Sequence, residues 1–150
     1  MADLRELYQE VILDHHKRPR NCRRPEDANK HADGFNPLCG DKVSVFARVE
    51  DGVISDIAFQ GTGCAISTAS ASMMTESLKG KSEAEAARVF ERFHDLVTGK
   101  TPPEADASGL GKLAVFAGVR DYPVRVKCAT LAWHTLRAAL KDAGKTVSTE

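Results

Sequence analysis

The 150-residue sequence has no excess charge of either sign, because 21 lysines and arginines balance 21 aspartates and glutamates. A neutral chain argues against general nucleic-acid binding, which depends on neutralising phosphates, although it leaves room for a local basic patch. The sequence also lacks a run of about 18 apolar residues, which a membrane-spanning helix needs. Its charged first residues have no apolar signal-peptide core behind them. We therefore expect a cytoplasmic protein that binds neither membranes nor nucleic acid.

Two groups of metal-site motifs are also missing. The motifs His-x-Glu and His-Glu-x-x-His do not occur. A zinc hydrolase or deaminase is therefore disfavoured, because no general base is apparent. The five histidines follow no ligand pattern, and we interpret each as a surface or packing residue. No Cys-x-x-Cys pair occurs either, so cysteine spacing alone is weak support for a metal site.

Four cysteines are nevertheless present, at positions 22, 39, 64 and 128. In a reducing compartment, cysteines of a chain with 42% apolar residues serve as metal ligands, catalytic groups or core residues more often than as disulfides. Cysteine is among the residue types most often buried, so four unrelated core cysteines are one interpretation. A shared metal site is the other.

The apolar pattern of the N-terminal half predicts one helix and a hairpin. Helical spacing predicts a helix over residues 3–16, followed by a polar connector that holds a short strand near residues 30–32. Period-two alternation predicts a strand over residues 41–50. Asp51-Gly52 is typical of a type I′ turn, whose two central residues need positive φ. The return strand is expected over residues 53–60, where the run Gly61-Thr62-Gly63 would end it.

Helical patterns dominate the second half. A helix over residues 65–79 is expected to stop at Gly80. Ser82-x-x-Glu85 predicts a capping box that opens another helix. The buried face of that helix should hold Phe90, Phe93 and Val97, and the core should also hold Met73 and Met74.

The remaining elements complete the expected fold class. Residues 98–108 are interpreted as a loop and residues 110–117 as a short helix, and Tyr122-Pro123 as an interruption before a last helix over residues 128–143. The predicted class is α+β, in a single domain over residues 1–150. It has an N-terminal helix, a small antiparallel sheet of about three strands, and helices packed on one side.

Three of the cysteines lie at the ends of expected elements, where different parts of the chain can converge. Cys39 precedes the hairpin, Cys64 lies between a strand and a helix, and Cys128 opens the last expected helix. A helix N-terminus favours a thiolate over a thiol, and the thiolate is the form that binds zinc. Asp41, two residues after Cys39, could supply an oxygen as a fourth ligand.

Two cationic side chains stand close to Cys128 in the sequence. Three thiolates, one carboxylate and Zn²⁺ together carry a net charge of about −2. Arg125 and Lys127 would offset that charge from beside the site.

Three segments resemble the cysteine signatures of a known family. They are residues 36–41 (NPLCGD), 61–67 (GTGCAIS) and 124–131 (VRVKCATL). Together with residues 7–15 and 19–21, they resemble the SufU/IscU (NifU N-terminal-like) family of iron–sulfur cluster assembly. The resemblance covers nearly the whole chain, in the same order.

Within that family the sequence is similar to the SufU branch. Lys127 precedes the last cysteine, where scaffold-type IscU proteins have histidine. Residues 99–117 match an insertion characteristic of SufU. Residues 122–125 echo only part of the Leu-Pro-Pro-Val-Lys segment by which IscU engages its Hsp70 chaperone.

The resemblance implies a zinc protein that accepts persulfide sulfur from a SufS-type cysteine desulfurase, with other Suf assembly proteins as further partners. Cys39, Asp41, Cys64 and Cys128 match the zinc ligands, and Cys39 matches the sulfur-accepting thiol. Cys22 matches no family ligand and is interpreted as an incidental thiol.

Two alternatives stay open. The chain could be a scaffold on which a [2Fe–2S] cluster is assembled on the same thiolates, in which case the purified protein would carry iron and sulfide. It could also be a structural zinc domain that binds a partner, in which case Cys39 would carry no sulfur during turnover.

Overall fold

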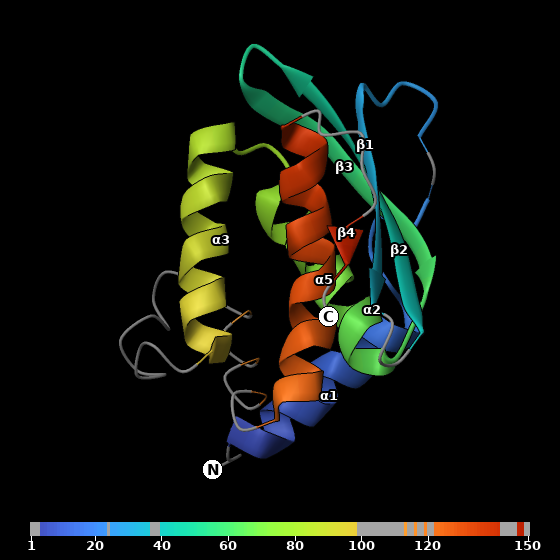
Figure 1. The fold of residues 1–150 in the computed structure, drawn as a ribbon, viewed down its shortest axis with the longest axis vertical. Coiled ribbons are helices and arrows are strands. Elements are labelled where there is room, and N and C mark those ends of the chain that lie inside the picture. Colours follow the sequence, from blue (N-terminus) through green and yellow to red (C-terminus); the bar gives the residue numbers. More distant parts are fainter. Residues whose placement is uncertain are drawn as a thin grey trace.

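The computed structural model describes residues 4–23, 25–36, 40–98, 113, 116, 119, 122–141 and 147–148, with the backbone alone for residues 4–8 and 147–148. These residues form an α+β fold, as expected (Figure 1). In chain order the elements are α1 (Leu4–Lys17), β1 (Lys30–Asn36), β2 (Asp41–Glu50), β3 (Val53–Thr62), α2 (Ala65–Leu78), α3 (Glu83–Thr98), α5 (Pro123–Leu140) and β4 (Val147–Ser148).

The sheet has the strand order β3-β2-β1-β4. The first three strands are antiparallel, as the sequence predicted, and β4 is a short fourth strand that pairs parallel to β1. The hairpin between β2 and β3 is confirmed, since Asp51 and Gly52 have φ values of 52° and 78°. Both positive angles are those that a type I′ turn requires.

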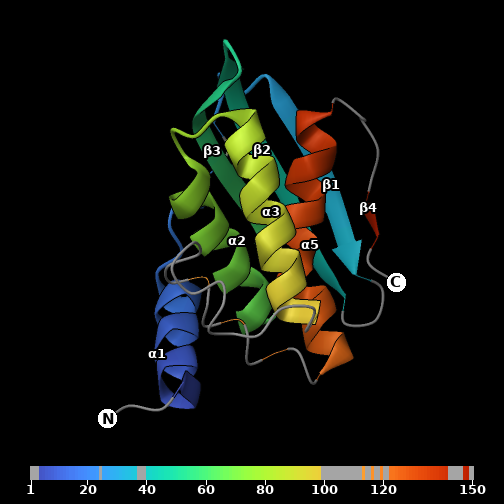
Figure 2. The same ribbon diagram turned by 90° about the vertical axis from the view of Figure 1, so that its left-hand side faces the viewer.

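The helices lie on one face of the sheet, also as predicted. Figure 2 shows α2, α3 and α5 in front of the strands, and Figure 1 shows α3 on the far side of α5 from the sheet. The core between sheet and helices is made of fully buried side chains from every layer, among them Val45, Ile57, Met74, Phe93 and Leu131. Among the described residues, no helix combines the length and the apolar character that crossing a bilayer would require.

A run of small residues lets α2 pack closely against α5. Ala69, Ser70, Ala71 and Ser72 are all buried. The Ser70 hydroxyl donates to the carbonyl of Ala129, and the Trp133 indole Nε1 donates to the Ser70 oxygen over 3.0 Å. The polar atoms of this buried seam are therefore paired, which is the condition for hiding serines inside a helix pair.

Three element boundaries differ from those expected. β1 continues to Asn36 instead of ending near residue 32, and β3 includes Gly61 and Thr62. The last helix begins at Pro123, five residues before Cys128. Proline at the first helical position needs no hydrogen bond from its nitrogen, so Tyr122-Pro123 starts the helix where an interruption was expected.

The capping box is confirmed, because the Ser82 hydroxyl accepts from the backbone N–H of Glu85 at 3.1 Å and contacts its carboxylate. Phe93 and Val97 are buried as expected, and Phe90 is partly buried. The expected loop over residues 98–108 lies outside the described residues after Thr98. Of the short helix expected over residues 110–117, only Leu113 and Phe116 are described, and both are buried.

Candidate metal centre

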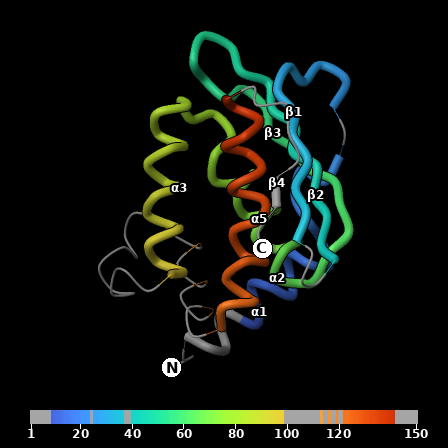
Figure 3. The backbone as a smooth tube through the Cα atoms, in the orientation of Figure 1, coloured from blue at the N-terminus to red at the C-terminus, as the bar shows by residue number. Residues whose placement is uncertain are grey.

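Three of the sequence-predicted site residues meet at the end of the sheet opposite the β2–β3 hairpin. Asp41 is the first residue of β2, Cys64 immediately precedes α2, and Cys128 lies in the second turn of α5. One carboxylate oxygen and the two sulfur atoms all lie within 4.8 Å of one another. Figure 3 shows the backbone passing from β3 into α2. Cys39 lies outside the described residues.

Asp41 is held in place by Cys64. Its side chain is buried, and its Oδ1 accepts a hydrogen bond from the backbone N–H of Cys64 at 2.9 Å. Its Oδ2 lies 3.5 Å from the Cys64 sulfur, which donates to it. A Cβ atom on Gly63 would lie 3.0 Å from Oδ1, so the absence of a side chain there allows this close approach. The carboxylate is therefore fixed before any metal binds.

Cys64 is the N-cap residue of α2. Its backbone is extended, with φ −68° and ψ 169°, and its sulfur accepts from the N–H of Ser67 at 3.4 Å. A hydrogen bond from Cys128, and then the Ser67 N–H, lower the pKa of the Cys64 thiol to about 7, against opposing contributions from burial and from Asp41. The lowered pKa favours the thiolate, which is the form that ligates a metal.

Cys128 has a different environment from the one expected. It was predicted at a helix N-terminus, but α5 begins five residues earlier, so the helix start cannot favour its thiolate in the way proposed. Its sulfur is buried, and the side-chain Nδ2 of the fully buried Asn36 lies 3.9 Å from it, within donating distance for sulfur. No role was predicted for Asn36 or Ser67 from the sequence. Only the folded chain brings the end of β1 against α5, 92 residues away in sequence.

The other residues singled out in the sequence are not part of this three-residue cluster. Arg125 is exposed, and its guanidinium lies 4.7 Å from the centre of the Tyr122 ring. Lys127 is partly buried one residue before Cys128. Their charge-balancing role stays a prediction. Cys22 is exposed, and its backbone forms an isolated parallel β-bridge with Phe59 on β3.

The histidines are packing or surface residues, as interpreted. His15 is buried, and its Nδ1 lies 2.7 Å from the Ser72 hydroxyl. His31 stacks on Phe46 with ring centres 4.9 Å apart. Among the described residues, the metal-compatible cluster contains no histidine.

The donor set fits zinc. Sulfur and carboxylate oxygen are both zinc ligands, and atoms bound to one tetrahedral zinc at about 2.0–2.3 Å lie roughly 3.3–3.8 Å apart. The three donor atoms, all within 4.8 Å of one another, need only small shifts to reach that geometry. A tetrahedral ion takes four ligands, and the sequence offers Cys39, two residues before Asp41, for the fourth position.

Comparisons with known proteins agree on one family. Residues 7–129 match the NifU-like N terminal domain. The chain is 41% identical over 141 residues to the iron-sulfur cluster assembly scaffold protein IscU of Streptococcus pyogenes serotype M1, covering 94% of this chain and 87% of that one. It is 40% identical over 144 residues to the zinc-dependent sulfurtransferase SufU of Bacillus subtilis, covering 95% and 96%.

A solved structure is similar in fold. A scaffold candidate for the SUF system from the thermophile Fervidobacterium islandicum AW-1 superposes with a TM-score of 0.82 at 37% identity, covering 90% of this chain and 97% of that one. The relatives therefore carry both scaffold and sulfurtransferase names at nearly equal identity, and similarity alone does not separate the two roles.

Proposed function

Since the chain belongs to the SufU/IscU family of iron–sulfur cluster assembly proteins, we propose that it is a single-domain, zinc-dependent sulfur acceptor that takes persulfide sulfur from a SufS-type cysteine desulfurase. The observation that carries the proposal is the cluster of Asp41, Cys64 and Cys128, with two sulfur donors and one oxygen donor. Lys127, in place of the histidine expected of scaffold-type members, supports it.

The proposed ligands are Cys39, Asp41, Cys64 and Cys128. A bound zinc would hold the cysteines as thiolates and lower their reactivity until a partner docks. The chain itself supplies the arrangement of the donors. Asp41 is held by the Cys64 N–H, and Cys128 lies buried beneath Asn36, whereas Cys64 is exposed.

In the proposed transfer, the Cys39 thiolate attacks the outer sulfur of the persulfide on the desulfurase cysteine. A bond forms between the Cys39 sulfur and that outer sulfur atom. The bond between the outer sulfur and the desulfurase cysteine breaks, and the desulfurase thiolate leaves with the electron pair. The product is a persulfide on Cys39, and the exchange needs no external oxidant or reductant.

The test measures alanine production by the desulfurase, with mass spectrometry of sulfur bound to the acceptor. Cys39→Ala should abolish the stimulation of turnover and the added sulfur mass while leaving the protein folded. Cys22→Ala is the matched control and should change neither, because Cys22 lies outside every matched motif. Asp41→Ala keeps the accepting thiol but loses an oxygen ligand, so metal affinity and the transfer rate should both change.

The scaffold role is the second candidate, because similarity to proteins named IscU is equally high. Metal analysis of protein purified without added metal separates the two: one zinc per chain supports the acceptor, and iron with acid-labile sulfide supports the scaffold. A Cys39→Ala variant that still stimulates turnover and still carries persulfide would favour the scaffold. A wild-type protein that binds zinc but never gains sulfur would indicate a structural zinc domain.

A further inference from the structure

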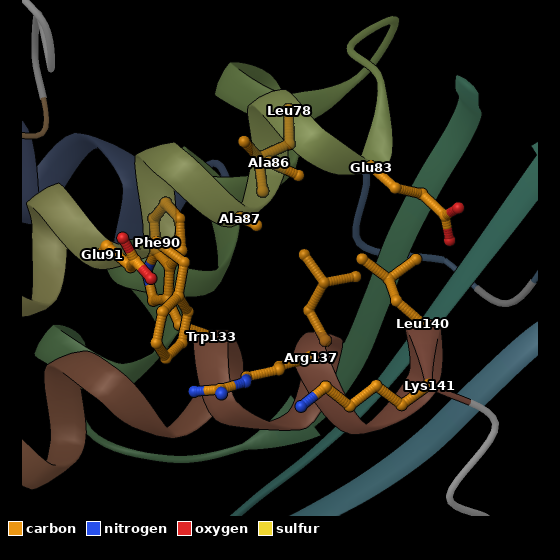
Figure 4. Close-up of a pocket in the computed structure, with 11 residues that line it drawn as sticks. Leu78, Glu83, Ala86, Ala87, Phe90, Glu91, Trp133, Arg137, Leu140 and Lys141 are labelled. Carbon is orange, nitrogen blue, oxygen red and sulfur yellow. The ribbon is translucent and has the colours of Figure 1, made fainter. Parts of the chain in front are cut away.

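A groove lies between α3 and α5, at the hairpin end of the molecule and away from the thiol cluster. It encloses about 300 Å³ and is lined by residues of α2, α3 and α5 (Figure 4). Most of its lining is apolar: Leu78, Ala86, Ala87, Phe90, Trp133, Leu136 and Leu140.

The groove follows from a change of side-chain size along α3. Near the C-terminal end of α3, Phe93 stacks on Trp133 with ring centres 4.5 Å apart, and Phe90 contacts the same indole ring. One turn before Phe90, the apolar residues by which α3 lines the groove are the small Ala86 and Ala87. Aromatic rings thus fill the space at one end of the helix pair, and alanines leave it open at the other.

Charged side chains flank this apolar space on both sides. Arg137 and Lys141 lie side by side along the α5 rim, and Glu83 and Glu91 lie at opposite ends of the α3 rim (Figure 4). Among the residues that the structure describes, neither acid forms an ion pair with either base. The Arg137 guanidinium instead lies 5.3 Å from the centre of the Phe90 ring, at the edge of the groove.

The spacing of these charges selects the sign of a ligand. Arg137 and Lys141 are one helical turn apart, so both can contact a single acidic group. Glu83 and Glu91 are eight residues apart, about 12 Å along the helix axis, so they cannot converge on one cationic group. The spacing therefore suits an anion between the two cations, and it does not suit a cation between the two acids.

We propose that the groove binds a small amphipathic anion, with its apolar body between Ala87 and Leu136 and its acidic group between Arg137 and Lys141. The volume lies at the lower end of the range for small-molecule sites, and the combination of an apolar lining with a few polar groups is typical of them. This site lies at the opposite end of α2 and α5 from the thiol cluster. The proposal does not depend on the sulfur-transfer function.

The chain offers a direct measurement, because Trp133 is its only tryptophan and lines the groove. The probe is 8-anilinonaphthalene-1-sulfonate, an aromatic body with one sulfonate, and the signal is energy transfer from the indole to the bound dye. Decanoate and decylamine, each below its micelle-forming concentration, then compete with the dye. They share an apolar chain and differ in charge. One dye should bind per protein. Decanoate should displace it at a concentration at least tenfold lower than decylamine requires.

Two variants test the two halves of the site. Ala87→Phe fills the groove and should abolish dye binding. The double variant Arg137→Gln/Lys141→Gln should weaken the binding of decanoate at least tenfold and leave the binding of decylamine unchanged. Its control is Lys17→Gln/Lys42→Gln, which removes the same charge from exposed positions outside the groove and should change neither. Circular dichroism establishes that each variant is folded.

Three results would overturn the proposal. One is dye binding that survives Ala87→Phe. A second is equal competition by decanoate and decylamine, which would mean that the groove holds apolar chains without reading charge. The third is displacement of the dye by an amphipathic helical peptide when decanoate has no effect, which would assign the groove to a protein partner.

Discussion

The two ends of the helical layer differ in how closely they are packed. At the thiol end, backbone and side chains approach so closely that a single added carbon atom would collide. At the groove end, the same helices leave about 300 Å³ between them.

Glycines mark this close packing. Gly34, Val43 and Gly61 pair in one row across β1, β2 and β3, and Val43 lies two residues from Asp41. The row extends from beside Asp41 to the sheet side of α5, where Gly34 meets Thr135. A Cβ atom on Gly34 would lie 2.0 Å from the Thr135 hydroxyl, and one on Gly61 would lie 2.2 Å from the Lys42 carbonyl. Metal ligands must be positioned to within about 0.5 Å, which requires closely packed and rigid surroundings, whereas a site for an apolar group does not.

The largest expected effect comes from removing metal at the thiol end. The donors come from β2, from the residue before α2, and from α5, so an ion that bridges them stabilises the folded chain. With free zinc at 1,000 times its dissociation constant, linkage gives about 4 kcal/mol of added stability. Thermal melting with and without chelator measures it. Ala87→Phe, at the groove end, should show the same metal-dependent shift, and a melting temperature insensitive to chelator would show that the site is not structural.

The next prediction compares the stability change caused by a larger side chain in two places, at Gly34 under α5 and at Ala87 in the groove. Gly34→Ala should lower the free energy of unfolding by about 1–3 kcal/mol, the range for overpacking a filled core. Ala87→Leu adds more atoms but places them in the groove, and it should change stability by less than about 0.5 kcal/mol. Urea denaturation of both metal-free variants checks the contrast. Equal losses would mean that the two ends are packed alike.

A smaller effect separates the two uses of the Cys64 sulfur. In metal-free protein, Cys64→Ser keeps an acceptor for the Ser67 N–H, and Cys64→Ala does not. The alanine variant should be less stable than the serine variant by about 1 kcal/mol, the usual value of an N-cap. Both should lose metal affinity to a similar extent, as measured by competition with a chromophoric chelator. Equal stability of the two variants would contradict the capping role.

The smallest expected effect is a pH dependence of stability that arises near the groove end. Asp56 on β3 pairs with Arg23 and lies 3.6 Å from Lys79, the residue that follows α2. The hydrogen bond from Arg23, assisted by the Arg23 and Lys79 charges, lowers the pKa of Asp56 in the folded chain. The pair therefore stabilises the fold above the ordinary aspartate pKa and loses this contribution as pH falls through the lowered value.

Because the pair is partly exposed, its contribution should be about 1 kcal/mol or less. The free energy of unfolding, measured between pH 7 and pH 3, should lose this component in Asp56→Asn. An unchanged pH profile in that variant would show that Asp56 does not contribute to the pH dependence of stability.

Local sequence signals predicted the elements well where one residue type answers one geometric need. Asp51-Gly52 supplies two positive φ angles, and Ser82 caps the helix that follows it. The start of α5 was misplaced because a proline permits both an interruption and a first helical turn, and only packing decides between them. β1 was underestimated because Gly34 and Asn36 face the core, so the strand lacks an apolar alternation.

The candidate site was predictable to the extent that it rests on recognisable cysteine signatures. Asp41, Cys64 and Cys128 come together as the sequence suggested, although their role as ligands stays a prediction. Asn36 could not be assigned in advance, since its contact with Cys128 joins residues 92 apart and exists only after folding. The Ser67 N–H has the three-residue spacing of an N-cap, but cysteine is not among the usual capping residues, so the pattern gave no signal.

Because Cys64 caps α2, hydrogen exchange in the first turn of this helix depends on where the Cys64 sulfur lies. The amide hydrogen of Ser67 is protected by the Cys64 sulfur. A thiolate bound to a metal can still accept from this amide, so the amide loses its acceptor only when the sulfur itself moves away from α2. Its rate of exchange with deuterated water should then rise while amides in the middle of α2 stay slow. The exchange rate of this one amide would thus report whether the Cys64 sulfur still caps the helix.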